Sequence, residues 1–207
     1  MPYNPDKHHR RSIRLKGYDY SRAGLYFITI CCQDRICRFG HVDNGEMVLN
    51  EFGQIAYNEW CNLPKRFANF ELDVFQIMPN HMHGIIVLNN AVGAGFTPAQ
   101  NGNNPENDTP AQNVAVAQNE TDIIQWAGAS PAPTTNASIS DIVGAYKSLV
   151  ANGCLDIYKS NNKTMGKLWQ RDYYEHIIRN EQSYQTITNY IIDNPAKWNE
   201  DKFYTAQ

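Results

Sequence analysis

The segment Asn80–Leu88, NHMHGIIVL, is the strongest indication of the fold in this 207-residue chain. Its second half, Gly84–Leu88, is apolar and β-branched, which is typical of a buried strand. Side chains two apart on a strand share one face, so His81 and His83 point the same way. Residues 71–77 alternate polar and apolar side chains. The sequence therefore predicts a strand-turn-strand hairpin that carries two imidazoles on one face.

The segments on either side of this hairpin predict further strands. Residues 25–32 combine aromatic and β-branched side chains and predict a buried strand. A second hairpin is predicted from 37–41 to 46–49, because the dipeptide Asn44-Gly45 between them is a strong turn signal. Residues 168–178 have mixed strand and loop character.

Three segments have a helical period. The first covers 51–61. The second begins after Ser138 and is expected to end near Gly153. The third, 181–193, ends before Pro195 because proline disfavours helical geometry in the preceding residue. Strands and helices in this order, with antiparallel hairpins, predict an α+β fold.

The composition changes abruptly between residues 91 and 137. This segment holds five of the ten prolines and is otherwise rich in Asn, Ala, Gln, Gly and Thr. Such a mixture cannot bury enough apolar area to offset its ordering entropy, so a disordered insertion is predicted. The chain then divides into a basic N-terminal segment (1–22), a first domain part (23–90), the low-complexity insertion (91–137) and a second domain part (138–200).

The net charge of −3 hides an uneven distribution. The insertion carries four acidic residues and no Lys or Arg, so the rest of the chain has a charge of −3 + 4 = +1. Residues 1–22 hold six basic and two acidic side chains, a local charge of +4. This segment is suited to contact phosphates, and a solvated basic tail is the equal alternative.

The sequence favours a cytoplasmic protein without a membrane partner. Its apolar runs are far shorter than the roughly 18 residues of a membrane span. The N-terminus has no apolar stretch like that of a secretory signal. The five cysteines lack the spacing of a disulfide framework, so reduced thiols are predicted.

The two histidines are a candidate metal pair, because neutral imidazoles suit a divalent ion that polarises a phosphoryl oxygen or activates water. Two histidines at this spacing also occur by chance. A catalytic site needs a third ligand, and Asn194 supplies an oxygen. For His176 a structural role is preferred. The other candidate ligands are Gln170, Glu175 and His176.

Tyr190 is a candidate nucleophile. It precedes Asn194 by one helical turn, so the phenol and the amide share one helical face. Tyrosine can attack a phosphodiester and hold the strand as a phosphotyrosyl ester. The alternative is a ring that packs in the core with Ile187 and Ile191.

Three ordered motifs carry a family resemblance. They are Met78–Ile85 (MPNHMHGI), Trp169–Arg179 (WQRDYYEHIIR) and Tyr190–Pro195 (YIIDNP). Over residues 18–198 the chain resembles the single-tyrosine His-hydrophobic-His transposases. Within that family the likeness is greatest to the REP-associated tyrosine transposases, which act on repetitive extragenic palindromes.

The resemblance implies a ferredoxin-like antiparallel sheet flanked by helices. It also implies a metal-dependent endonuclease and strand transferase that acts on single-stranded DNA near hairpins during transposition. Tyr190 would be the nucleophile and form a 5′-phosphotyrosyl link. His81 and His83 would bind Mg²⁺ or Mn²⁺, with Asn194 as the third ligand.

The resemblance further implies single-stranded or hairpin DNA as the partner. Basic side chains are expected at the foot of the hairpin and on phosphates, and aromatic rings on unpaired bases. Family members occur as monomers and as dimers, so a homodimer stays open. The candidate DNA contacts are Arg10, Arg11, Arg14, Arg171 and Arg179, and the candidate stacking rings are Trp169, Tyr173 and Tyr174.

Two functions from other classes remain as alternatives. One is a domesticated protein that binds palindromic DNA without moving it. The other is a zinc-dependent hydrolase in which the two histidines activate water and Tyr190 is only a core residue.

Overall fold

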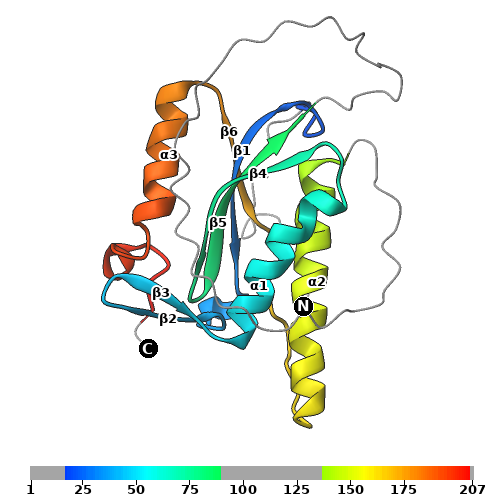
Figure 1. Ribbon diagram of the computed structural model, residues 1–207, viewed down its shortest axis with the longest axis vertical. Helices are drawn as coiled ribbons and strands as arrows, with labels where there is room; N and C mark the ends of the chain where they lie inside the picture. Colours follow the sequence, from blue (N-terminus) through cyan, green and yellow to red (C-terminus); the bar gives the residue numbers. More distant parts are fainter. Residues whose placement is uncertain (1–16, 90–136, 206–207) are drawn as a thin grey trace, which may run out of the picture. The chain divides into compact units, whose positions relative to one another are not determined.

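Four antiparallel strands in the order β4-β5-β1-β6 form the main sheet of the computed structural model, which describes residues 17–89 and 137–205 (Figure 1). A separate two-stranded sheet, β2-β3, lies between β1 and α1 in the chain. The strands are β1 (Gly24–Cys31), β2 (Gly40–Asp43), β3 (Glu46–Leu49), β4 (Phe70–Met78), β5 (His81–Leu88) and β6 (Tyr174–Ile178). The helices are α1 (Glu51–Asn62), α2 (Ile139–Ser160) and α3 (Glu181–Asp193), with short 3₁₀ turns at Gln33–Arg35, Leu63–Lys65 and Trp198–Glu200.

The order of the main elements is β1-α1-β4-β5-α2-β6, which is the ferredoxin-like β-α-β-β-α-β arrangement. β5 lies between β1 and β4 and pairs antiparallel with both. β6 pairs with the free side of β1 and forms one edge of the sheet. The predicted α+β, ferredoxin-like fold is therefore confirmed.

The two faces of the sheet are covered by different helices. α1 and α2 pack on one face and α3 on the other (Figure 1). Because side chains alternate along a strand, Met82 and Ile86 of β5 lie in the large core with Trp60 and Tyr146 from the two helices. Ile85, on the opposite face of β5, belongs to the smaller cluster beneath α3.

Local side-chain caps explain where the helices begin. The side chain of Asn50 accepts a hydrogen bond from the Gly53 amide at the start of α1. Ser138 and Asp141 form a reciprocal capping box at the start of α2. Asn180 caps α3 in the same way as Asn50 caps α1. Each such cap stabilises a helix by about 1 kcal/mol.

One glycine of β5 is required by the packing on the helical face. A Cβ on Gly84 would lie 3.0 Å from Cζ2 of Trp60 and 3.3 Å from the Phe75 side chain. Because glycine has no side chain here, the Trp60 ring of α1 can pack directly against the strand that carries the histidines. The helical core thus helps to fix the position of β5.

The expected end of the second helix near Gly153 is wrong. α2 continues to Ser160, seven residues further. A Cβ on Gly153 would lie 2.9 Å from Cγ2 of Ile55 in α1, so this glycine allows close contact between two helices instead of ending one. Cys154, the next residue, is buried in the core and favours continuation of the helix. The first strand of the small hairpin also starts later than expected, at Gly40.

Some predictions fall outside the described residues. They concern the basic segment up to residue 16 and the insertion from 91 to 136. Ala137, the last residue of the predicted insertion, is buried, and its backbone exchanges two hydrogen bonds with the side chain of Asn69. The cysteines of the described chain are free thiols, as expected. Within the described chain no helix is both long and apolar enough to span a membrane.

Candidate active site

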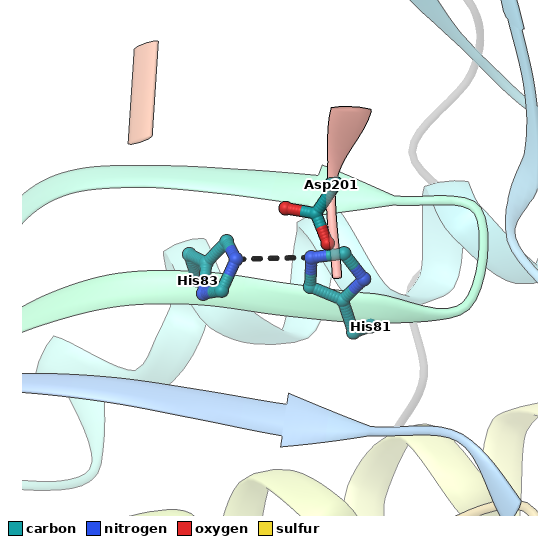
Figure 2. Close-up of side chains that lie close together, drawn as sticks. All are labelled: His81, His83 and Asp201. Carbon is teal, nitrogen blue, oxygen red and sulfur yellow. Dashed lines mark hydrogen bonds between the residues drawn. The ribbon is translucent and has the colours of Figure 1, made fainter. Parts of the chain in front are cut away.

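The site begins with the two buried histidines of β5. His81 and His83 are both fully buried on the face of the sheet that α3 covers. Their Nε2 atoms lie 3.0 Å apart. Figure 2 shows the two rings turned toward one another, with the Asp201 carboxylate beside them. One ligand atom from each of the three residues lies within 4.8 Å of the others, so they could hold one metal ion.

Asn80 fixes the tautomer of His81. The Asn80 amide nitrogen donates to the carbonyls of Arg35 and Phe203, so its oxygen is free to accept. That oxygen lies 2.8 Å from Nδ1 of His81, which therefore carries the proton. The lone pair of His81 is consequently on Nε2 and directed at His83.

His83 is oriented by the strand next to it. Thr29 of β1 is paired with His83 in the sheet, and its hydroxyl lies 2.8 Å from Nδ1 of His83. A threonine hydroxyl accepts from one imidazole tautomer and donates to the other. Nε2 of His83 donates to the lone pair on Nε2 of His81, 3.0 Å away. Transfer of this proton to Nδ1 would turn both Nε2 lone pairs toward the same small space. Such an arrangement is suited to a divalent cation.

Burial keeps both imidazoles neutral. It is the main cause that lowers the pKa of His81 to about 3, and the charges of Lys202 and Arg35 add to it. Burial and the neighbouring His81 ring hold the pKa of His83 well below its ordinary value. Neutral imidazoles are the form that binds metal, so the two side chains offer nitrogen ligands without first losing a proton.

α3 brings Tyr190 to the histidines. Its hydroxyl lies 3.1 Å from Nε2 of His83 and donates to Oδ2 of Asp201 at 3.2 Å. Burial and the Asp201 carboxylate raise the pKa of the Tyr190 phenol. The ring is nevertheless 39% exposed, so one side of it is open to solvent. An accessible phenol beside candidate metal ligands is suited to attack an incoming phosphodiester.

Asn194 lies in the same cluster but contacts it through Asp201. Its amide nitrogen donates to Oδ2 of Asp201 at 2.9 Å. Its amide oxygen is buried and has no hydrogen-bond partner. A buried acceptor without a partner is costly, and a bound cation or its water ligand would satisfy it. Two imidazoles and a carboxylate, with this amide oxygen close to the carboxylate, fit a divalent metal ion.

Asp201 is the site residue that sequence reasoning missed. It follows the Trp198–Glu200 turn and lies just beyond the predicted domain boundary at residue 200. The Phe203 amide donates to its Oδ1, which orients the carboxylate. An acidic residue eleven positions after Tyr190 forms no helical or strand pattern with it. The only available signal was its place shortly after the last motif.

The other candidate ligands lie outside this cluster. Glu175 is buried on β6 and pairs in the sheet with Ile28, whose side chain faces α1 and α2, so it points away from the histidines. His176 lies along the edge strand and lines a groove next to α3. The backbone amide of Gln170 donates to the carbonyl of Cys31, and its carbonyl accepts from Nζ of Lys147. Neither Glu175 nor His176 belongs to the metal-ligand group found in the described chain.

The predicted DNA contacts are only partly described. Arg171 lies in the loop before β6 and Arg179 directly follows β6. Both side chains are exposed. The rings of that motif differ in burial, since Trp169 is buried and Tyr174 is 40% exposed. Arg10, Arg11 and Arg14 lie outside the described residues. The roles of all five arginines stay predictions.

Comparison with known proteins gives two sequence relatives from Haemophilus influenzae. One, an uncharacterized protein, is 38% identical over 203 residues, which cover 98% of this chain and 97% of the relative. The other is named "Putative REP-associated tyrosine transposase" and is 26% identical over 180 residues, which cover 86% of this chain and 74% of that protein. No family model matches the chain.

One solved structure shares the fold. It is a REP-associated tyrosine transposase bound to a REP hairpin, with a TM-score of 0.51 and 18% sequence identity over 91% of this chain and 76% of the other. At this identity the match shows the fold. The relative named as a putative REP-associated tyrosine transposase and the His81-x-His83 motif both agree with this structural match. The chain therefore belongs to one family with the uncharacterized Haemophilus protein and is a transposase-like relative of the REP-associated tyrosine transposases.

Proposed function

We propose that this protein is a metal-dependent endonuclease and strand transferase that cuts and joins single-stranded DNA near hairpins. The observation that carries the proposal is the contact between the Tyr190 hydroxyl and Nε2 of His83, 3.1 Å apart, beside the Asp201 carboxylate. A core tyrosine, as the hydrolase alternative requires, would not expose 39% of its surface next to candidate metal ligands.

In the proposed reaction the Tyr190 oxygen attacks the phosphorus of a DNA phosphodiester. Asp201 accepts the hydrogen bond of the phenol and is the base that takes up that proton. A bond forms between the phenol oxygen and phosphorus, and the bond from phosphorus to the 3′ oxygen breaks. The 3′ oxygen takes up a proton, so the products are a 5′-phosphotyrosyl link and a free 3′ hydroxyl. Attack by another 3′ hydroxyl on this link rejoins DNA and frees the phenol.

His81, His83 and Asp201 would hold a divalent cation, with the Asn194 amide oxygen as a further donor. When bound, the cation supplies positive charge for the phosphoryl oxygens, whose charge grows during the attack. Thr29 and Asn80 hold the imidazoles in place through Nδ1. The partner is hairpin DNA, as in the solved relative.

Three of the site residues meet within a single chain. β5, α3 and the segment after it supply His83, Tyr190 and Asp201, and these are in hydrogen-bonding contact. This supports cleavage by a single protomer. The homodimer stays a prediction.

The test is the covalent adduct between protein and DNA. Labelled single strands from the gene's flanks are incubated with wild type, Tyr190→Phe and Tyr57→Phe, with and without Mg²⁺ or Mn²⁺, and separated on a denaturing gel. Tyr57 is a matched control, since it is 41% exposed but lies on α1, across the sheet. We expect a metal-dependent adduct in wild type and Tyr57→Phe and none in Tyr190→Phe.

Other outcomes would identify the alternatives. Hairpin binding by all three proteins without any adduct would indicate a palindrome-binding protein. Metal-dependent hydrolysis that persists in Tyr190→Phe would indicate the hydrolase.

A further inference from the structure

A groove of about 440 Å³ lies between the edge strand β6 and α3. One side is aromatic, formed by Phe27 of β1 and Tyr174 of β6. The other side is formed by Ile187 and by amide and hydroxyl side chains at the start of α3, among them Gln182 and Thr186. Because β6 has no further strand beyond it, the groove opens at the edge of the sheet.

The Phe27 ring joins this groove to the candidate active site. It stacks on His83, with ring centroids 5.4 Å apart, and meets Tyr190 edge-to-face at 6.2 Å. It also meets Tyr174 edge-to-face at 6.1 Å. The ring is 8% exposed, so it forms a common wall between the nucleophile and the groove. A molecule in the groove would therefore lie next to the phosphate that Tyr190 attacks.

The lining of the groove suits a flat, neutral heterocycle. Aromatic faces stack on any nucleobase, and amides and hydroxyls can pair with its polar edge. The exposed Tyr174 ring offers such a face. Among the described residues that line the groove, none carries a carboxylate that would repel DNA.

A cation lies beside Tyr174, one of the residues that line the groove. Nζ of Lys202 is 5.8 Å from the centre of the Tyr174 ring and 4.8 Å from that of Phe203. Phe203 itself packs on His81, with ring centroids 4.6 Å apart. Lys202 is thus placed between the groove and the candidate metal ligands, where a DNA phosphate would pass.

We propose that this groove binds an unpaired base of the DNA strand next to the phosphodiester that Tyr190 attacks. The base stacks on Tyr174 and is read by the side chains of α3, while Lys202 contacts the phosphate that links it to the active site. The proposal rests on the proposed function, because it takes the substrate to be single-stranded DNA.

Equilibrium binding tests it without requiring cleavage. The background is Tyr190→Phe, and the probe is the fluorescently labelled strand from the gene's flanks that this variant binds most tightly. The strand is used intact or with an abasic residue at successive positions, and fluorescence anisotropy gives the Kd. We expect one abasic position to weaken binding by roughly five- to a hundredfold, as for loss of one stacked base.

Two groove variants assign that loss to the groove. Tyr174→Ala removes the stacking ring, and Thr186→Trp fills the groove from an exposed position of α3. Each should weaken binding of the intact strand to the same extent as the abasic change and add little when combined with it. Gln185→Trp, the adjacent exposed position that does not line the groove, is the matched control and should leave the Kd unchanged.

The result that overturns the proposal is full additivity of the abasic and groove changes at every position, or no effect of Thr186→Trp. Failure of the groove is distinguishable from failure of the proposed function. If the wild type forms the covalent adduct but the groove variants bind DNA as tightly as the background protein, the groove proposal fails and the proposed function stands. If no flanking strand binds at all, both proposals fail.

Discussion

The two faces of the main sheet differ in what they bury, although the same strand supplies both. Toward α1 and α2, β5 presents Met82 and Ile86 to a core of apolar and aromatic side chains. Toward α3 it presents His81 and His83, which are equally buried but polar. The face toward α1 and α2 removes apolar surface from water. The face toward α3 buries imidazole nitrogens, and the Asn194 amide oxygen is buried without a hydrogen-bond partner.

The two faces of β5 therefore have different roles, since one stabilises the fold and the other carries the candidate ligands. Packing on the helical face holds β5 in place, and Gly84 lets the Trp60 ring reach it. On the other face, buried polar groups cost stability unless they are satisfied. Such groups are expected where a protein binds a ligand that satisfies them. Substitutions on the two faces should therefore affect different measurements.

The largest expected effect is on the helical face. Trp60→Ala removes a fully buried ring that packs on Phe70, Phe75 and Tyr146. We expect the free energy of unfolding to fall by about 3–5 kcal/mol, measured by urea denaturation. A loss below about 1 kcal/mol would show that this face does not carry the stability of the fold.

The next effect concerns the metal on the opposite face. Saturating Mn²⁺ should stabilise the wild type by about 2.7 kcal/mol at a hundred times its Kd, read as a rise in Tm. His83→Ala should abolish this rise, whatever its own effect on stability. Met82→Ala, at the neighbouring position of β5, is the matched control: it should lower Tm but keep the rise. A metal-dependent rise in His83→Ala would contradict the site.

The smallest effect distinguishes Asp201 from Asn194. Asp201→Asn removes the charged ligand and should weaken Mn²⁺ binding, measured by calorimetry, by at least the roughly 10-fold that loss of a ligand-orienting partner costs. Asn194→Ala should weaken it less, since its amide nitrogen positions the Asp201 carboxylate and its buried oxygen is a neutral donor. If Asn194→Ala weakened Mn²⁺ binding as much as Asp201→Asn or more, Asn194, the ligand that the resemblance implies, would be the more important ligand.

Much of the fold follows from local patterns. The period of two in β5 and the period near 3.6 in α3 depend only on neighbouring residues, so the pair of histidines and the shared face of Tyr190 and Asn194 were predictable. The positive backbone angles of Asn44 and Gly45 match the predicted hairpin turn. The end of α2 was not predictable in this way, because Gly153 serves contact with another helix.

Local sequence patterns establish which side chains share a face and where most elements begin and end, and the motifs indicate to which proteins the chain is related. The contact of Tyr190 with His83, the place of Asp201 in the cluster and the groove behind Phe27 are visible only once the elements are packed together. This is because local periodicity fixes directions along one element. Distances between elements depend on packing of residues far apart in the chain, and no short pattern encodes that packing.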